Sequence, residues 1–478
     1  MYAECRKSLS YKKFKSYLMK YRTEKDSLGN VKVPANAYYG AQTQRAIQNY
    51  QISGIRFSFS FIKAQAVIKK SAALANMKDK RLDTKKGNAI IKAADEIIKG
   101  NLRDQFILDV YQSGAGVSQN MNINEVIANR ATQILGGKKG NYIVNPNDHV
   151  NMSQSTNDTI HTAIHIASTD GLDGLIDELD NLKKTLDKKS KQFNKIVKSG
   201  RTHLQDAVPM TLGQEFGGYS KVIEKNVLNL RKAYFSLLEL NIGATAIGTG
   251  INTGKNYKKN VITEINKITK KKFRPSENYF EGTAFMNAEL ELSSALKILA
   301  IDLLKISDDL RLLSSGPVTA IGELILPAMQ PGSSIMPGKV NPVMPEMLDM
   351  ICMQVIGNDT TVTFACKGEL QLNVFMPVVA YNLLQSMEIL TKGVKSFNQK
   401  CVAGIKVNEK KIKQNLEKNA IVVTALSPYI GYAKAAEVAK RAYSENKTIK
   451  EIIIEMKLMD EKKLMQILDY RKMTRLSG

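Results

Sequence analysis

Long stretches of helical periodicity constrain the fold of this chain most strongly. From Asp158 to about Ser199, apolar residues recur at three- and four-residue spacing, the pattern of an amphipathic helix. They are Leu172, Leu175, Ile176, Leu179, Leu182 and Leu186. Comparable stretches cover 213–240, 283–313 and 344–404. Helices of this length must bury their apolar faces against one another, so the sequence predicts a mainly α fold with a central bundle of long helices.

The remaining patterns are shorter. Strand signals are short and confined to the ends of the chain, for example at 51–57. The segment from about Lys406 onward alternates short helical patterns with turns, which indicates a small separate unit. A chain of 478 residues is long enough for several such units.

Cysteine spacing and hydropathy bear on the compartment. Cys5, Cys352, Cys366 and Cys401 lie far apart without CxxC spacing, which argues against a disulfide framework and against a zinc site. No stretch approaches the roughly 20 uncharged apolar residues that a membrane helix requires. The sequence therefore predicts a soluble protein of the reducing cytoplasm, with no membrane partner.

Two of the four histidines have metal-ligand spacing. His161 and His165 would share one face of a helix. The pair forms no HExxH pattern and no cysteine lies nearby in the sequence, so we favour a packed helix face and expect no metal.

The chain is strongly basic, with a formal net charge of +24. A nucleic-acid-binding protein usually concentrates Arg and aromatic residues in a patch or a known module. Here lysines dominate and are scattered over the expected helix surfaces, so we favour a compositional bias that could help to attract a small dianion. A non-catalytic basic scaffold or nucleic-acid-binding protein is the alternative interpretation.

The first twenty residues are basic and lack an uninterrupted apolar stretch, which excludes a secretory signal. Two interpretations stay open. The segment is a weak organellar presequence, or translation starts at Met19.

Two clusters of small and polar residues are candidate ligand sites. The run SGAGVSQNMN at 113–122 would let backbone amides approach a ligand closely. The run NPNDHVNMSQSTND at 145–158 places Ser155, Thr156 and Asn157 at an expected helix N-terminus, which favours an anion. Simple helix capping explains these residues equally well.

Two further clusters carry groups with acid, base or charge chemistry. In GRTHLQDAVPMTLGQ, Thr202 and His203 are expected just after a long helix ends. In GSSIMPGKVNP at 332–342, glycines and prolines break helix and strand and surround Ser333, Ser334, Lys339 and Asn341. These four side chains together could hold a carboxylate and position a base.

Two more sequence features concern the site. Glu346 follows the 332–342 loop and could orient a histidine. The stretch GATAIGTGINTGK at 243–255 matches neither a dinucleotide-binding nor a P-loop pattern and is interpreted as a helix-to-helix turn near a site.

Three of these segments resemble signatures of the aspartase/fumarase superfamily, lyases that remove ammonia, water or another amine from a succinyl group to leave fumarate. They are the stretch at 153–158, GRTHLQDAVPMTLGQEF and GSSIMPGKVNP, and the likeness extends from about Arg22 to Met473. The resemblance implies homotetramers with a 20-helix core and active sites each built from three subunits. It also implies a mixed domain at 21–156, a helical-bundle domain at 157–405 and a small helical domain at 406–478, and the basic segment 1–20 is an extension that precedes them.

Several strings look more like aspartases than fumarases. In DQFILDVYQSGAG, Ala115 stands where fumarases usually carry a serine, and LNIGATAIGTGINT, RLLSSGP and GNDTTVT point the same way. GELQLNVFMPV mixes the two patterns. The resemblance therefore implies an ammonia-lyase acting on L-aspartate, with a class II fumarate hydratase as the alternative.

The resemblance also assigns residue roles, and it requires no cofactor. Ser333 would be the base that removes a proton as its loop closes over the substrate. Ser155, Thr156 and Ser334 would bind the β-carboxylate, and Lys339, Asn341 and Thr202 the α-carboxylate. Asn157 and His203 would lie near the amino group, with Glu346 supporting His203.

Two residues depart from the family pattern. Val117 occupies a position where both aspartases and fumarases carry a substrate-contacting Thr, and Val318 replaces the Arg of the usual SGPR string. We expect an altered substrate, a lower activity or compensation by other residues.

Overall fold

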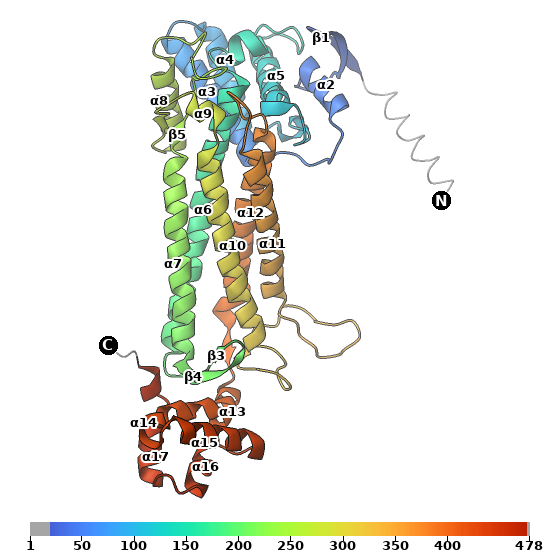
Figure 1. Cartoon of the computed structure of the whole chain (residues 1–478). Helices are drawn as coiled ribbons and strands as arrows, with labels where there is room; N and C mark the ends of the chain where they lie inside the picture. Colours follow the sequence, from blue (N-terminus) through green and yellow to red (C-terminus); the bar gives the residue numbers. More distant parts are fainter. Residues whose placement is uncertain (1–19, 476–478) are drawn as a thin grey trace. The chain divides into compact units, whose positions relative to one another are not determined.

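The computed structural model describes residues 20–475, and these are mainly helical, as predicted (Figure 1). The basic extension predicted at the N-terminus therefore lies, up to residue 19, outside the described residues. None of the described helices combines the length and the apolar character needed to cross a membrane.

The periodic stretches correspond to the five longest described helices. These are α6 (Thr156–Gln192), α7 (Leu212–Ser236), α10 (Asn287–Leu313), α11 (Val343–Ala365) and α12 (Met376–Lys400). The six periodic apolar residues of α6 are all buried, which confirms the amphipathic pattern. The prediction of one continuous helical stretch at 344–404 is wrong, because this region forms two helices, α11 and α12. The first ends at Ala365, and the chain then passes through Gly368, which lies in the left-handed region at φ 57°.

The chain divides into two compact units, and the boundary falls within each of these five helices. One unit comprises the chain up to Leu175 together with Asn229–Lys297 and Gln354–Ile389. The other comprises Ile176–Leu228, Ile298–Met353 and the chain from Leu390 onward.

The first unit surrounds a core of aliphatic side chains from its N-terminal elements. The antiparallel pair β1 (Tyr21–Asp26) and β2 (Gly29–Pro34) precedes four helices, α2 (Ala41–Asn49), α3 (Phe59–Lys78), α4 (Thr84–Ile98) and α5 (Val117–Ile134). Later elements are β5 (Glu239–Leu240), α8 (Tyr257–Thr269), β6 (Arg274–Pro275) and α9 (Glu281–Ala284).

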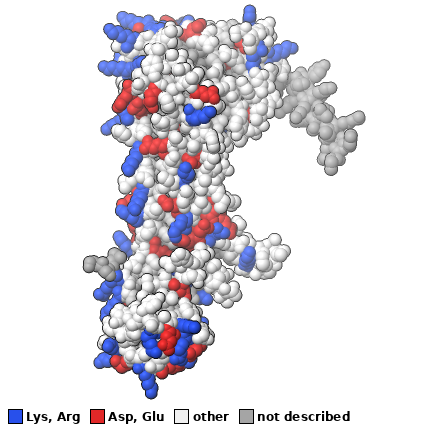
Figure 2. Space-filling model, in the orientation of Figure 1, with Lys and Arg blue, Asp and Glu red and all other residues white. Residues whose placement is uncertain are grey.

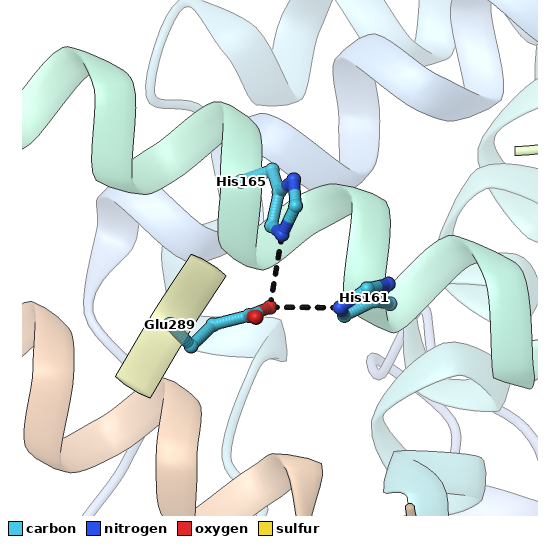
Figure 3. A group of neighbouring side chains, drawn as sticks. All are labelled: His161, His165 and Glu289. Carbon is cyan, nitrogen blue, oxygen red and sulfur yellow. Dashed lines mark ion pairs between the residues drawn. The ribbon is translucent and has the colours of Figure 1, made fainter. Parts of the chain in front are cut away.

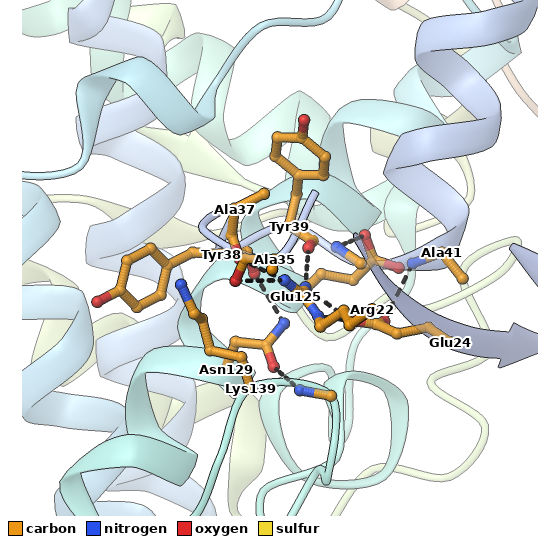
Figure 4. Close-up of polar contacts among 12 residues, drawn as sticks. Arg22, Glu24, Ala35, Ala37, Tyr38, Tyr39, Ala41, Glu125, Asn129 and Lys139 are labelled. Carbon is orange, nitrogen blue, oxygen red and sulfur yellow. Dashed lines mark hydrogen bonds and ion pairs between the residues drawn. The ribbon is translucent and has the colours of Figure 1, made fainter. Parts of the chain in front are cut away.

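Buried polar contacts fix the start of the described chain (Figure 4). Arg22 donates hydrogen bonds to the carbonyls of Pro34, Ala37 and Tyr39 at 2.7–2.8 Å. The buried Glu125 accepts hydrogen bonds from backbone N–H groups in the first turn of α2 and just before it. Glu125 thereby supplies hydrogen-bond acceptors to N–H groups at the start of α2, which has no side-chain cap of its own.

The second unit carries the antiparallel hairpin of β3 (Val197–Thr202) and β4 (Gln205–Thr211) and the short pair of β7 (Leu324–Ile325) and β8 (Lys406–Val407). Its C-terminal helices pack around a core of their own. They are α13 (Glu409–Lys418), α14 (Ser427–Ile430), α15 (Tyr432–Glu445), α16 (Ile449–Glu455) and α17 (Glu461–Ile467).

Strand placement differs from the sequence expectation. The hairpin of β3 and β4 lies in the middle of the chain, where no strand was expected, and α6 ends at Gln192 rather than near Ser199. The segment 51–57 forms no strand, because only Arg56 pairs with another residue, Asp109, through a single bridge.

Polar bonds join the long helices within each unit. In the first, Ser293 of α10 donates to Asp359 of α11 at 2.7 Å, and Asn358 of α11 donates to Ser386 of α12 at 2.9 Å. In the second, Asn226 of α7 donates to Asp302 of α10 at 2.7 Å. Such side-chain bonds between apolar faces fix the register of packed helices.

Basic side chains are dispersed over the surface. On the face shown in Figure 2, Lys and Arg are interspersed with Asp and Glu. This distribution agrees with a compositional bias toward lysine.

Candidate active site

Three predicted site residues lie where α6 begins, in the first unit. Thr156 is the first residue of α6, and Ser155 precedes it, with its Oγ accepting a hydrogen bond from the Asn157 N–H at 3.3 Å. All three side chains are half-buried. Because an N-terminal turn presents free N–H groups beside two hydroxyls, this position suits a carboxylate, and capping and ligand binding are compatible here.

Asp158 fixes the geometry of this helix start. Its buried carboxylate accepts hydrogen bonds from the backbone N–H groups of Ser155 at 2.9 Å and of Gly243 and Thr245 at 3.0 Å. Burial raises the pKa of Asp158 to about 6, although the three N–H donors oppose this shift. The Asn157 side chain also donates to the Ala246 carbonyl at 2.6 Å. The 243–255 loop, which lies between β5 and α8, is therefore held against the start of α6.

A buried lysine supports the same turn from α3. The Lys69 ammonium donates to the side-chain oxygens of Asn120, Asn151 and Gln154 at 2.8–3.0 Å. Burial lowers the pKa of Lys69 to about 7, although the charge of Asp158 opposes this shift. Three oxygen acceptors match the three N–H bonds of an ammonium group.

Asn120 connects this lysine to the candidate site. Its amide donates to the Thr156 Oγ at 3.1 Å. Since this oxygen already accepts, the Thr156 hydroxyl hydrogen is left to donate to a ligand. Sequence reasoning missed the roles of Lys69, Asn120 and Asp158, because nothing local marks residues of separate segments as partners.

Val117 begins α5, one helical turn before Asn120. Its side chain is 43% exposed and lies at the start of the helix that also carries Asn120. Just before it, Ala115 is buried in the left-handed region at φ 58° and donates its N–H to the Val374 carbonyl at 2.7 Å. The residue types at 115 and 117 therefore determine which groups the start of α5 presents.

In the second unit, the hairpin of β3 and β4 carries Thr202 and His203 at its tip. His203 and Leu204 both have positive φ, 54° and 59°, the backbone form of a two-residue type I′ turn. Thr202 and His203 are exposed. The expectation that they directly follow a long helix is wrong, since β3 separates them from α6.

A buried ion-pair cluster anchors this hairpin. Glu323 is fully buried and lies 2.6 Å from the Arg201 guanidinium and 3.2 Å from the Lys198 ammonium. Burial raises the pKa of Glu323, but the hydrogen bond from Arg201 and the charges of Lys198 and Arg201 hold it below its usual value. Because Arg201 and Lys198 belong to β3, the cluster fixes the strand that presents Thr202 and His203.

The 332–342 loop connects β7 to α11 and is closed upon itself. The Gly332 N–H donates to the Lys339 carbonyl at 2.9 Å, and the Asn341 side chain donates to the Gly332 carbonyl at 2.6 Å. A Cβ at Gly332 would lie 2.3 Å from the Lys339 carbonyl oxygen, so only glycine fits. The Ser333 Oγ accepts from the N–H of Met336 at 2.9 Å, while Ser334 and Lys339 are exposed.

A cavity of 920 Å³ adjoins this loop. Lys339, Asn341 and Glu346 line it together with Arg311 and Ser315. Its volume lies in the range of small-molecule sites. The structure thus brings three of the predicted site residues to one cavity, and the other predicted residues of this unit lie on the same loop or on the hairpin.

Comparison with known proteins identifies the family. Residues 29–357, more than half of the chain, match the family described as Lyase, and residues 422–475 match the family described as Fumarase C C-terminus. The chain belongs to the aspartase/fumarase superfamily. Membership of this superfamily makes it a lyase, and the expected fold class is confirmed.

Two relatives that are named for different activities are equally similar to this chain. The aspartate ammonia-lyase of Bacillus subtilis (strain 168) is 46% identical over 457 residues, 95% of this chain and 96% of the relative. The class II fumarate hydratase of the same organism is 46% identical over 445 residues, 93% and 96% of the two chains. Overall identity therefore does not distinguish ammonia from water as the leaving group.

The solved structures agree on the fold. The crystal structure of recombinant class II fumarase from Schistosoma mansoni superimposes with a TM-score of 0.93 at 36% identity, covering 96% of this chain and 100% of that one.

Proposed function

We propose that the chain is an aspartate ammonia-lyase that catalyses the reversible anti-elimination of ammonia from L-aspartate to give fumarate. The observation that carries this choice is the aspartase-like segment DQFILDVYQSGAG, with Ala115 in place of the serine usual in fumarases. This residue sits in the turn that leads into α5, whose first turns carry Val117 and Asn120. The leaving-group choice thus rests on a segment next to the proposed carboxylate site.

Stabilising charge is the main chemical task. Removing a proton beside a carboxylate gives a doubly charged aci-carboxylate, so donors and cations must meet the developing charge. Ser333 is proposed as the base, acting as an alkoxide, and Lys339 and backbone N–H groups favour its charged form when solvent is excluded. The loop geometry supports this, because the Ser333 Oγ already accepts the N–H of Met336. No cofactor is required, since side chains and backbone supply the charge stabilisation.

Two carboxylate sites hold the substrate in this proposal. Ser155, Thr156 and Ser334 bind the β-carboxylate, and the N–H groups at the start of α6 support them. Lys339, Asn341 and Thr202 bind the α-carboxylate. Asn157 and His203 lie near the amino group, and Glu346 positions His203. The geometry of Thr156, with its oxygen occupied by Asn120, supports its role as a donor.

The proposed site is assembled by oligomerisation. The carboxylate-binding residues lie on three separate segments, which are the start of α6, the hairpin tip and the 332–342 loop. We propose a homotetramer with a 20-helix core, in which three subunits contribute to each site. Each cytoplasmic subunit would comprise the domains 21–156, 157–405 and 406–478, with L-aspartate, fumarate and ammonia as its small-molecule partners and with no nucleic acid and no membrane partner.

A class II fumarate hydratase, converting L-malate to fumarate and water, is the second candidate. GELQLNVFMPV shares features with fumarases, and the overall identity to fumarate hydratases equals that to ammonia-lyases.

One assay with two substrates tests the proposal. The purified protein is given L-aspartate or L-malate, and the ultraviolet absorbance of fumarate is followed. We expect a clearly higher kcat/KM with L-aspartate, and a higher value with L-malate would replace the proposal by the hydratase. If neither substrate reacts and salt-sensitive nucleic-acid binding appears, the enzyme interpretation fails.

We expect the substitution Val117→Thr to raise kcat/KM for L-aspartate. It restores the hydroxyl that family members carry at the first position of α5, and a hydrogen bond to a charged group contributes about 1.5–3 kcal/mol, or roughly ten- to a hundredfold. Val117→Ala is the control, because it shortens the side chain without adding a donor. An unchanged or lower value for Val117→Thr would contradict the proposed role of this position.

A further inference from the structure

A cluster of two histidines and one glutamate lies in the first unit (Figure 3). His161 and His165 occur one turn apart on α6, and Glu289 comes from the first turn of α10. The Glu289 Oε1 lies 2.9 Å from the His161 Nε2 and 3.1 Å from the His165 Nε2. The helix face that carries the two histidines is therefore buried, as expected. It packs against a carboxylate, Glu289, that lies far away in the sequence.

The hydrogen-bond partner of His165 fixes its tautomer. Its Nδ1 lies 2.7 Å from the Glu239 carbonyl oxygen, which can only accept. The Nδ1 therefore carries the hydrogen, and in the neutral ring the Nε2 presents a lone pair toward Glu289. Metal-binding histidines commonly have this arrangement, with the second ring nitrogen donating to a carbonyl.

The facing atoms are not otherwise satisfied. Apart from the two contacts within the cluster, neither Nε2 atom nor either Glu289 oxygen has a hydrogen-bond partner in the part of the chain that the structure describes, although all three side chains are at least nine-tenths buried. Buried polar atoms without partners are costly, so such a group indicates a missing ion or proton.

The spacing suits a metal ion. The three ligand atoms lie within 4.8 Å of one another. An ion bound at about 2.1 Å in tetrahedral geometry holds its ligand atoms roughly 3.4 Å apart, so Glu289 and each histidine would need only small shifts relative to one another. Two imidazoles and one carboxylate favour first-row transition metals over Mg²⁺ or Ca²⁺, which prefer oxygen ligands.

A cavity of 260 Å³ opens beside the cluster and leaves room for a further ligand such as water. His161, His165 and Glu289 line it together with Glu281, Glu291 and Arg274. With Glu239, three additional carboxyl groups and one guanidinium leave its lining acidic, which would attract a cation.

We propose that His161, His165 and Glu289 form a binding site for a divalent first-row transition-metal ion such as Zn²⁺. The ion would join α6 to α10 and would leave one coordination position facing the cavity. This site does not depend on which leaving group the enzyme removes, because it involves none of the proposed catalytic residues.

Calorimetric titration of the full-length protein tests the proposal. The protein is treated with a chelator, dialysed and titrated with Zn²⁺, and we expect one ion per chain. Glu289→Gln keeps the size of the side chain but removes the anionic ligand, so affinity should fall by about a hundredfold or more. Glu291→Gln, on the same helix at the cavity edge, and His149→Gln, which removes a histidine from another segment, should bind as the wild type does.

Cobalt spectroscopy of the wild type gives a readout that does not depend on a variant's stability. Co²⁺ should produce the intense visible bands of a four-coordinate site with nitrogen ligands, and added Zn²⁺ should remove them. The melting temperature should also rise with Zn²⁺ in the wild type and in Glu291→Gln. Absence of stoichiometric binding, or equal affinity in Glu289→Gln and Glu291→Gln, would overturn the proposal and leave the cluster as a proton-mediated contact.

Discussion

Replacing Ser333 by Ala is expected to lower kcat for fumarate formation by about three to four orders of magnitude, the scale of losing a positioned general base. The substitution removes the oxygen that would accept the substrate proton. It also removes the acceptor for the Met336 N–H, but it leaves the Gly332 to Lys339 backbone bond that closes the loop. Activity should therefore fall without loss of the fold or of the oligomer, as measured by circular dichroism and light scattering.

Ser334→Ala is the matched control for this experiment. It removes the neighbouring hydroxyl, proposed to bind a carboxylate, so we expect a loss of about ten- to a hundredfold in kcat/KM. If Ser333→Ala retained substantial turnover, or if the two variants were equally impaired, Ser333 would not be the base.

Glu323→Gln is expected to lower the free energy of unfolding by about 3–5 kcal/mol, the usual cost of breaking a buried ion pair by removing one partner. The change leaves Lys198 and Arg201 without their shared carboxylate. Glu224→Gln is the control, because Glu224 forms only surface pairs, with Lys221 and Lys183, and its replacement should change the free energy of unfolding far less. Denaturant midpoints at equal protein concentration compare the variants, and equal midpoints would show that Glu323 does not anchor the hairpin.

The stabilisation by Glu323 should depend on pH in one direction. Its folded-state pKa lies below the ordinary value of 4.5, so the carboxylate stabilises the fold above that pH. This contribution is lost as the pH falls through the folded-state pKa. The difference between wild type and Glu323→Gln should be constant near neutrality and should shrink in acid.

Much of the fold was predictable from apolar spacing, because a helix that buries one face repeats its pattern over many turns. The periodic residues of α6 show this, as all six are buried. The ends of the elements were not predictable in the same way. The hairpin at 197–211 depends on two residues with positive φ, His203 and Leu204, and neither type signals such a turn in the sequence.

The candidate site was predictable only where its residues are neighbours along the chain. Ser155 and Thr156, or Ser333 and Lys339, form local patterns with recognisable chemistry. Their supporting partners come from other segments, as Lys69 and Asn120 do for Thr156. For the same reason, the sequence did not predict that Glu289 lies beside the two histidines, since only the packing of α10 against α6 brings them together.

The backbone bond between Gly332 and Lys339 has a mechanical consequence. It converts the intervening residues into a small ring, so a closing movement would carry the proposed base and the proposed carboxylate-binding lysine together as one rigid body. Rotation would then be concentrated in residues outside the ring other than Pro331 and Pro342, because the proline ring fixes φ at these two positions. The distance between the two groups would be set before a substrate arrives, and closure would change only their distance from the remainder of the site.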